Sequence, residues 1–431
     1  MKAAASGALP LTLADWLGHI ERVHPQAIEM GLDRVVAVKQ ALGLAPSYPV
    51  ITVGGTNGKG SACAMLEAML DHAGYRVGCY TSPHLLRYNE RVRVSRREAS
   101  DAALVSALDA VEAARGEIPL TYFEFSTLAA AWVFAQARVE VAVLEVGLGG
   151  RLDAVNAFDA DCALIMSVDL DHLDYLGATR ESIGLEKAGI FRKGRPAVCA
   201  DACPPSTLTE HAANIGAGLL LAGRDFGHET RAQQWRYWGP RGERHGLPHP
   251  ALRGNHQIAN AAACIAALDT LRERLPVSAN DIRAGLVDAE NPARFQVLPG
   301  RPAVILDVAH NPAAASALAQ NLARMPSAGR TLAVFAMLKD KDISGVIDAV
   351  KNRIDAWFVA GTEGPRAADA SAVRAELARA GVLDTVSTCA NVVDAYAQAC
   401  DQAAENDRIL VFGSFYTVAA IMAVREHEPR R

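Results

Sequence analysis

The chain has 431 residues, of which 50% are hydrophobic and 21% are charged, and its formal net charge at pH 7 is −5. This length exceeds what one hydrophobic core usually supports, so we expect two or three domains. The slight negative charge provides no general attraction for nucleic acid or for an anionic membrane surface, and we expect neither as a partner. The apolar patch near the N-terminus contains Asp15 and is shorter than the ~18 uncharged residues of a membrane span, which predicts a cytoplasmic protein.

The eight cysteines are scattered through apolar segments and lack the close spacing of a disulfide scaffold. We therefore expect buried thiols. Cys199 and Cys203 stand four residues apart, but no second Cys or His pair at zinc-finger spacing follows them. This pattern disfavours a structural zinc site.

Residues 12–43 have the apolar spacing of helices, with a second helix expected at about residues 32–42. The segment between the two expected helices contains Ala27, Ile28 and Glu29. These residues fit either a packed loop or the wall of a ligand site, and the local pattern favours the packed loop.

A glycine-rich loop, GGTNGKGS, lies at residues 54–61 between an apolar β-branched run and an apolar helix. Such loops hold polyphosphate because their backbone N–H groups point inward and the helix N-terminus adds partial positive charge. Lys59 is placed to reach the terminal phosphates, and Ser61 would lie beside a magnesium ion. Gly60 separates Lys59 from Ser61, which departs from the usual GxxxxGK[ST] spacing. A plain glycine turn is the alternative, but a lysine inside the loop favours nucleotide binding.

A short strand at residues 77–81 runs into Ser82, Pro83 and His84, which places polar groups at the sheet edge where open α/β sheets bind ligands. An alanine-rich helix is expected at residues 100–115. The stretch TYFEF follows, with an exposed-looking aromatic pair around Glu124, and a further helix is expected from about Ser126 to Ala137.

A fully apolar strand at residues 141–144 ends in Glu145, and glycines at 147, 149 and 150 follow it. A carboxylate at the end of a buried strand is costly unless a cation meets it. We therefore favour Glu145 as a magnesium ligand over a structural salt bridge.

The next apolar strand, at residues 162–168, runs into DLDHLDYLG. A lone histidine such as His172 is often a satisfied core residue, but its place at a strand end among three aspartates favours metal or phosphate chemistry. The helix at residues 182–191 then contributes Lys187, for which the spacing alone indicates no role beyond a surface or ion-pair residue.

Residues 222–254 are rich in Gly, Arg, Trp and Pro and have no helical period, which predicts a β-ribbon or an irregular excursion. An amphipathic helix begins near His256. Asn260 lies in its first turn, where it would either cap the helix or bind an adenine edge.

Prolines and a glycine break the pattern at residues 291–302 and mark a domain boundary, giving predicted domains of residues 1–296 and 297–431. Beyond it, strands alternate with helices, which favours a parallel, doubly wound sheet. GxGxxG is absent from it, so we expect no dinucleotide site. Asp307 and His310 follow its first strand, at the ligand edge.

The predicted fold class is therefore α/β, with an N-terminal P-loop ATPase-type domain and a smaller C-terminal Rossmann-like domain. A nucleotide loop, a carboxylate and a histidine at strand ends indicate phosphoryl transfer, with the second domain closing over the first. A kinase, a hydrolytic switch and a ligase remain open at this level.

A series of short segments spans nearly the whole chain in a fixed order: GTNGKGS, SPHLLRYNERVRV, EVGLGGRLDAVN, the DH of DLDHLDYLG, EKAGIFR, ARFQVLPGRP and DVAHNP. Together they resemble the folylpolyglutamate synthase/dihydrofolate synthase family, which belongs to the ATP-dependent amide-forming ligases that include the muramyl peptide ligases. The SPHL and GLGGRLDA segments resemble the folate branch of these ligases rather than the cell-wall branch.

The resemblance implies that ATP phosphorylates a carboxylate, that the amine of L-glutamate attacks the acyl phosphate, and that phosphate then leaves. The acceptor would be dihydropteroate, the γ-carboxylate of reduced folates, or both in a bifunctional monomer that uses ATP and two Mg²⁺ ions. Two alternatives remain, a UDP-muramyl-type amino-acid ligase and a nucleotide-dependent switch or binding module.

The resemblance also implies roles for individual residues. Lys59, Lys187 and His310 would take part in catalysis, with Lys187 carried as N6-carboxylysine and His310 near the point where glutamate enters. ATP would be bound by Thr56, Asn57, Gly58, Lys59, Gly60, Ser61, Asn260, Arg294 and Asp307; magnesium by Ser61, Ser82, Glu145, His172 and Lys187; and the pterin by Ala27, Ile28, Glu29, Thr121, Tyr122, Phe123, Glu124, Leu152, Asp153 and Ala154.

The chain departs from the family pattern at Val155, where the family usually has a threonine in its DATN segment. A side-chain hydroxyl is therefore absent here. Asp153 and Asn156, on either side of this position, match the pattern.

Overall fold

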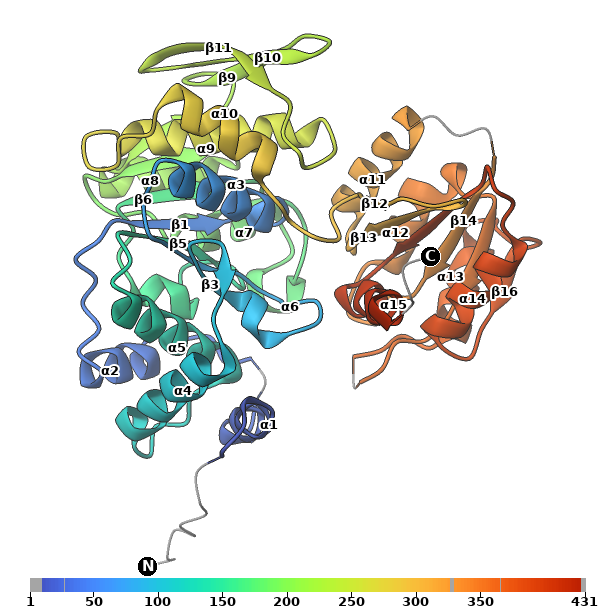
Figure 1. The fold of residues 1–431 in the computed structure, drawn as a ribbon, viewed down its shortest axis with the longest axis horizontal. Helices are drawn as coiled ribbons and strands as arrows, with labels where there is room; N and C mark the ends of the chain where they lie inside the picture. Colours follow the sequence, from blue (N-terminus) through green and yellow to red (C-terminus); the bar gives the residue numbers. More distant parts are fainter. Residues whose placement is uncertain (1–9, 27, 326–328, 365, 428–431) are drawn as a thin grey trace, which may run out of the picture.

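The computed structural model describes residues 10–26, 28–325, 329–364 and 366–427, and these form two α/β domains that lie side by side (Figure 1). The larger domain precedes the smaller one in the chain. Each has its own open sheet with helices on both faces, which confirms the predicted fold class.

The first domain is built on an eight-stranded sheet in the order β4-β3-β2-β5-β1-β6-β7-β8. The strands from β2 to β8 in this order run parallel, and β3 and β4 form an antiparallel hairpin at one edge. The register sets Val53 opposite Glu145, so the start of the glycine-rich loop and the Glu145 carboxylate reach the same sheet edge. The strands are β1 (Val50–Gly54), β2 (Val77–Tyr80), β3 (Val92–Val94), β4 (Arg97–Glu98), β5 (Val141–Glu145), β6 (Cys162–Ile165), β7 (Pro196–Cys199) and β8 (Gly218–Leu221).

Helices cover both faces of this sheet (Figure 1). The helix after the glycine-rich loop, α3, is buried along most of its length because it lies between the sheet and α10, which explains its apolar, alanine-rich sequence. One face carries α3 (Lys59–His72), α9 (His256–Thr270) and α10 (Ala279–Asp288); the other carries α1 (Leu13–Val23), α2 (Asp33–Ala41), α4 (Asp101–Arg115), α5 (Tyr122–Ala137), α7 (Arg180–Ala188) and α8 (Ser206–Ile215), and the short elements η1 (Tyr88–Arg91), η2 (Ala154–Ala157) and α6 (Leu173–Leu176) connect them.

A small antiparallel sheet covers α9 and confirms the β-ribbon predicted for residues 222–254. Its strands are β9 (Gly227–Thr230), β10 (Gln234–Gly239) and β11 (Gly242–Pro248). Trp235, Tyr237 and Leu247 are buried on its inner side, so the aromatic residues of this stretch serve the core.

The second domain has a six-stranded sheet in the order β12-β13-β17-β14-β15-β16, parallel except for β12. Helices α11, α12 and α13 cover one face and α14 and α15 the other, as expected for a doubly wound sheet. The elements are β12 (Gln296–Leu298), β13 (Ala303–Asp307), α11 (Pro312–Arg324), β14 (Thr331–Phe335), α12 (Ile343–Val350), η3 (Lys351–Arg353), β15 (Ala356–Val359), α13 (Ala370–Arg379), β16 (Val386–Thr388), α14 (Val392–Gln402), β17 (Arg408–Phe412) and α15 (Phe415–His427). The predicted division after residue 296 stays a prediction.

Some local expectations were wrong. The helix expected from Ser126 begins at Tyr122, because Thr121 accepts a hydrogen bond from the Glu124 N–H and caps it. The aromatic pair around Glu124 is not exposed, since Phe125 is fully buried. Of the cysteines, Cys203 is exposed and Cys400 partly so, while the other six are buried as expected.

Across the described residues, we find no helix with the length and apolar character that a membrane crossing requires.

The contact between α3 and α10 is a direct test of the first domain's packing. A Cβ atom at Gly285 would lie 2.6 Å from the Met69 backbone, so Gly285→Ala should force the helices apart and lower the free energy of unfolding by about 1–3 kcal/mol. The control is Gly18→Ala in α1, where the nearest atom, on Arg22, is 3.5 Å away and the better helix propensity should add about 0.5–1 kcal/mol. Equal urea-unfolding free energies for the two variants would contradict the packing described.

Candidate active site

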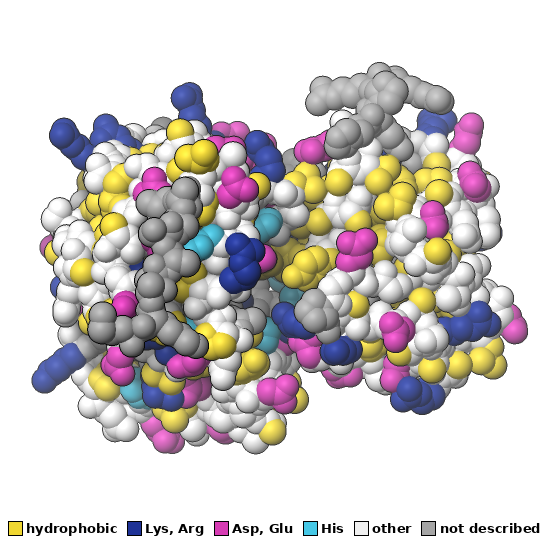
Figure 2. Space-filling view, turned by 90° about the horizontal axis from the view of Figure 1, so that it is seen from below, with side chains coloured by type: hydrophobic (Ala, Val, Ile, Leu, Met, Phe, Trp, Pro, Cys, Tyr) yellow, Lys and Arg dark blue, Asp and Glu magenta, His cyan; other side chains and the backbone are white. Residues whose placement is uncertain are grey.

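A cavity of about 970 Å³ lies between the two domains. Its first wall comes from the loops at the carboxyl ends of β1, β2, β5 and β6, and its second wall from the loop after β13, the residues around Lys341 and the start of α15. Figure 2 shows the two lobes meeting at a narrower waist. The cavity therefore lies where the carboxyl ends of parallel strands from both sheets face each other.

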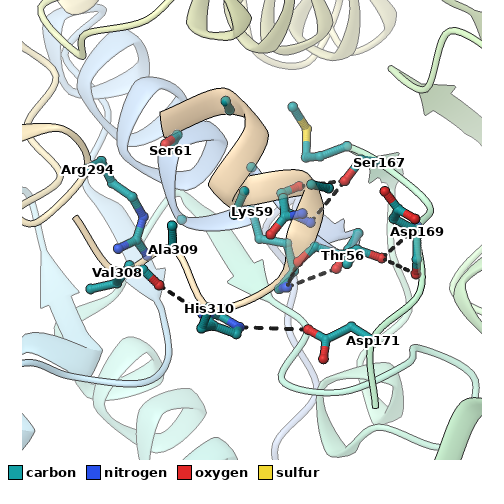
Figure 3. A pocket seen from close by; sticks show the side chains of 18 of the residues that line it. Thr56, Lys59, Ser61, Ser167, Asp169, Asp171, Arg294, Val308, Ala309 and His310 are labelled. Atoms are coloured by element: carbon teal, nitrogen blue, oxygen red, sulfur yellow. Dashed lines mark hydrogen bonds and ion pairs between the residues drawn. The ribbon is translucent and has the colours of Figure 1, made fainter. Parts of the chain in front are cut away.

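The glycine-rich loop forms part of this cavity wall and is held by Ser167, two residues after the end of β6 (Figure 3). The Thr56 N–H donates to the Ser167 carbonyl at 2.8 Å, and the Asn57 N–H donates to Ser167 Oγ at 2.9 Å. Lys59 Nζ donates to the carbonyls of Gly55 and Thr56 at 2.8 and 3.0 Å. The lysine thus folds back over its own loop, and its charge lies at the mouth of the phosphate-type cradle.

Glycine is required in this loop for both conformation and space. Gly58 has a φ of 87°, and a Cβ atom there would lie 3.2 Å from Asn260 Oδ1. The extra glycine, Gly60, faces the segment between the domains, where a Cβ atom would lie 3.2 Å from Asn291 Nδ2 and 3.7 Å from Arg294 Nη2. The unusual spacing of the loop therefore lets the second domain's connecting segment approach it closely.

Glu145 ends β5 beside this loop and is 4% exposed. Its Oε2 accepts one hydrogen bond, from the Ser82 N–H at 3.1 Å, and it has no ion pair among the described residues. Burial raises the pKa of Glu145, opposed by the charge of Lys59 and by the Ser82 N–H. Ser61, in the first turn of α3, is also buried, and its Oγ accepts a hydrogen bond from Gln257 Nε2 at 3.2 Å. A buried carboxylate with so few donors is a site that a cation would stabilise.

Asp171 links the domains at the far side of the loop. It accepts from Lys341 Nζ at 2.6 Å, and its Oδ2 lies 3.7 Å from His310 Nε2 (Figure 3). Burial alone would raise the pKa of Asp171, but its contacts with His310 and with the charged Lys341 amine hold it well below its ordinary value. Burial lowers the pKa of His172 to about 4, which Asp171 opposes and Lys341 reinforces. His172 is therefore neutral at pH 7.

A second pair of side chains joins the domains. Asn57 Nδ2 donates to Asn311 Oδ1 at 3.2 Å, and Asn311 Nδ2 donates back to Asn57 Oδ1 at 3.0 Å. Asn311 also caps α11 by accepting from the Ala314 N–H. The glycine-rich loop is thus tied to the first turn of a helix of the second domain.

Lys187 is on α7, is 3% exposed and lines the cavity. Among the described residues, its Nζ has no hydrogen bond or ion pair. Burial lowers the pKa of Lys187 to about 7, and the charge of Lys59 acts in the same direction. A large share of this amine is therefore uncharged at neutral pH.

The three residues outside the glycine-rich loop that were assigned to the nucleotide also line the cavity. Asn260 does not cap α9, because its Nδ2 donates to Gln257 Oε1 at 3.0 Å. Arg294 lies over the Phe415 ring, 5.0 Å from its centroid. Asp307 accepts from the Phe295 and Ala309 N–H groups, both at 2.8 Å, and burial raises its pKa.

The residues assigned to the pterin are placed differently, because none of those described lines this cavity. Ala27 is outside the described residues. Arg34 pairs with Glu29 and Glu124, which brings the loop after α1 to the start of α5. Ile28 is partly buried, and Thr121, with Tyr122 and Phe123 after it, begins that helix.

The third group assigned to the pterin, at residues 152–154, precedes η2. Asp153 accepts from the N–H groups of Leu148 and Val155 and so holds the glycine loop after β5. Leu152 is partly buried and Ala154 buried. Val155 is fully buried in an apolar cluster, which accounts for an apolar side chain at that position.

Sequence reasoning missed Lys341, Gln257 and Arg91, which line the cavity, and Asn311, whose side-chain amide pairs with that of Asn57. Asn311 follows His310 in the DVAHNP segment and Gln257 precedes Asn260, so proximity in the chain was an available signal for both. Lys341 lies in the charged stretch KDKD, and nothing in that stretch marks it as a cavity residue. Across the described ranges, no three His, Cys, Asp or Glu side chains gather into a metal site.

Residues 53–268 of the chain match the family described as Mur ligase middle domain, and residues 293–415 match Mur ligase, glutamate ligase domain. The dihydrofolate synthase/folylpolyglutamate synthase of Escherichia coli (strain K12) is 45% identical over 413 residues, covering 96% of this chain and 95% of that protein. That of Haemophilus influenzae is 39% identical, covering 96% and 98%.

Solved structures agree with these relatives. E. coli FolC in complex with DHPP and ADP is 44% identical and superimposes with a TM-score of 0.92, covering 96% of this chain and 98% of that one. A bifunctional folylpolyglutamate synthase/dihydrofolate synthase with Mn, AMPPNP and L-glutamate bound is 43% identical with a TM-score of 0.89, covering 99% and 100%. The chain therefore belongs to the folylpolyglutamate synthase/dihydrofolate synthase family and consists of Mur ligase domains.

Proposed function

We propose that this chain is an ATP-dependent ligase that joins L-glutamate both to dihydropteroate and to the γ-carboxylate of reduced folates. The observation that carries the proposal is the single cavity that unites the Lys59 loop, Glu145 and Lys187 with His310 and Lys341 of the second domain. Relatives named for both activities, alike over nearly the whole chain, support it. We further propose that it acts as a monomer, because both walls of the cavity come from one chain. We also propose that it is cytoplasmic, as expected from its sequence.

In the first step, the loop of Thr56, Asn57, Gly58, Lys59, Gly60 and Ser61 binds the polyphosphate of ATP through its backbone N–H groups. Lys59 exchanges the carbonyls of its own loop for phosphate oxygens. An oxygen of the acceptor carboxylate attacks the γ-phosphorus, the bond to the β-phosphate oxygen breaks, and an acyl phosphate and ADP result. Asn260, Arg294 and Asp307 hold the nucleotide at the boundary between the domains.

In the second step, the amine of L-glutamate attacks the acyl phosphate carbon, and phosphate leaves. Because a carbonyl only accepts, His310 Nδ1 donates to the Val308 carbonyl at 2.9 Å, which leaves the lone pair of a neutral ring on Nε2. His310 Nε2 takes the proton that the amine loses, and the Asp171 carboxylate, 3.7 Å away, stabilises the resulting imidazolium.

The residues at the loop fit Mg²⁺, because Glu145 is a buried carboxylate that lacks an ion pair in the described part of the chain. The family resemblance implies two Mg²⁺ ions. Their protein ligands would be Ser61, Ser82, Glu145 and His172. A site with few protein ligands is typical of Mg²⁺, which usually keeps several waters and substrate phosphate oxygens as its other ligands. When bound, it would offset the repulsion between the phosphate groups and the acceptor carboxylate.

Lys187 fits a carbamate for a separate reason. Its amine is buried without a partner among the described residues, and its pKa is lowered to about 7. Only an uncharged amine adds CO₂, and the product is an anion that faces the cationic side of the cavity near Lys59. We propose that Lys187 is carried as N6-carboxylysine and contributes a metal ligand. The pterin would bind near Ile28, Glu29, Thr121, Tyr122, Phe123, Glu124, Leu152, Asp153 and Ala154.

The test of the proposed function uses purified protein, ATP, labelled L-glutamate and either dihydropteroate or tetrahydrofolate, with products resolved by mass. We expect a glutamylated product from each acceptor, and ADP release that requires both acceptor and glutamate. ATP turnover with neither substrate and without product would indicate a nucleotide-dependent switch instead. Product from a UDP-linked acceptor alone would assign the chain to muramyl-type chemistry.

Lys187→Ala should lower kcat by at least about 100-fold, the cost of losing one fixed charge that stabilises the transition state. Short-chain carboxylates should restore part of the activity, because they replace the carbamate. Since the carbamate forms only from the uncharged amine, its fraction at fixed CO₂ should rise with pH through the lowered pKa of about 7.

The control for this substitution is Lys193→Ala, which removes an exposed lysine just beyond α7. A ¹³C-bicarbonate NMR experiment should show a carbamate carbon in the wild-type protein and in the control, and none in Lys187→Ala. Unchanged activity of Lys187→Ala would remove the carbamate from the mechanism.

A further inference from the structure

Arg91, the last residue of η1, is a buried cation in the cavity wall. It is 8% exposed and lines the cavity on the side of Ser82 and His84. Its Nε donates to His84 Nδ1 at 2.8 Å, and its guanidinium lies over the rings of Tyr88 and Tyr122, 5.7 and 5.4 Å from their centroids. No carboxylate of the described residues forms an ion pair with it.

The acidic side chains near Arg91 bind other groups. Glu90 accepts three backbone N–H groups of the preceding loop, each at 2.7 Å. Glu98 pairs with Arg87, and Glu67 pairs with Arg93. A buried guanidinium without a carboxylate is costly, so the arrangement favours an anionic ligand.

The surroundings also fix the direction of the guanidinium. Because an arginine N–H only donates, His84 Nδ1 is the acceptor of the 2.8 Å bond from Arg91 Nε. The two tyrosine rings limit rotation of the guanidinium plane. The remaining N–H groups, on Nη1 and Nη2, form the fork that binds carboxylates in a bidentate manner.

The backbone places Arg91 next to the proposed reaction centre. The Arg91 carbonyl accepts a hydrogen bond from the Thr81 N–H at 3.0 Å. Ser82, which follows Thr81 in the chain, donates its N–H to Glu145. The reacting carboxylate of the acceptor must lie on this side of the cavity, beside the phosphate loop. Dihydropteroate has only that carboxylate, whereas a glutamylated folate has a second one, the α-carboxylate, three carbons away from it.

We propose that Arg91 binds the α-carboxylate of the terminal glutamate on an acceptor that is already glutamylated. The inference rests on the proposed function and deepens it, because it separates the two reactions. Arg91 is a specificity-determining residue for chain extension and is dispensable for adding the first glutamate.

The first test compares Arg91→Gln and Arg91→Lys with the wild-type protein on both acceptors. We expect kcat/KM for tetrahydrofolate to fall about 10- to 100-fold in Arg91→Gln, the range that one charge-assisted hydrogen-bonded pair supplies, mainly through KM. Arg91→Lys, which keeps the charge, should lose less. With dihydropteroate both variants should stay within about twofold of the wild-type protein, which also shows that they are folded.

The matched control is Arg87→Gln, which removes an exposed positive charge from the same segment. It should leave both activities unchanged. An equal loss with both acceptors in Arg91→Gln would overturn the inference, as would a raised KM for free L-glutamate with both acceptors, which would place Arg91 at the incoming amino acid.

A second test changes the acceptor and not the protein. Tetrahydropteroyl-γ-aminobutyrate keeps the reacting carboxylate and lacks the α-carboxylate. The wild-type protein should lose about as much kcat/KM on this acceptor as Arg91→Gln loses on tetrahydrofolate, and Arg91→Gln should lose little more. Full additivity of the two losses would overturn the inference, whereas no product from the wild-type protein with any acceptor would overturn the proposed function itself.

Discussion

The structure depends on the balance of buried charge around the phosphate-type loop. Lys59 is held by carbonyls of its own loop, and Glu145 accepts a single hydrogen bond at the same sheet edge. Lys187 is buried without a partner among the described residues. Each of these groups is costly to bury alone, so the arrangement is one that polyphosphate, a divalent cation and a carboxylate would stabilise together. Glu145 and Lys187, buried ionisable groups without an ion pair among the described residues, thus indicate which kinds of ligand the cavity would bind.

The same balance explains the role of the second domain. The mutual amide pair of Asn57 and Asn311 and the ion pair of Asp171 and Lys341 tie the loops of the first sheet to the second domain. Asn311 follows His310 in the chain and Asp171 contacts its ring, so the position of the proposed proton acceptor is set by how the domains meet. The site is therefore complete only where the two domains meet.

Much of the fold and part of the site were predictable from local pattern. Short stretches of the chain are enough to predict three features: the loop containing Lys59, the carboxylate at the end of β5, and the alternation of strands and helices after residue 302. The end of a buried strand and a glycine turn both depend on residues that are close in the chain, so the sequence pattern is enough to predict them. The start of α5 was misplaced because the Thr121 cap has a weaker signal than the apolar run that follows.

What the sequence by itself determined is the pair of α/β domains, the phosphate-type loop and the polar residues at strand ends. Only the tertiary structure decided which distant side chains meet. Lys341 and Asp171, separated by 170 residues, pair across the domains. Within the part of the chain that the structure describes, Arg91 has no carboxylate partner, because its acidic neighbours bind other groups. Secondary structure follows from local backbone and side-chain preferences, whereas the pairing of charges depends on packing between segments that are remote in the chain.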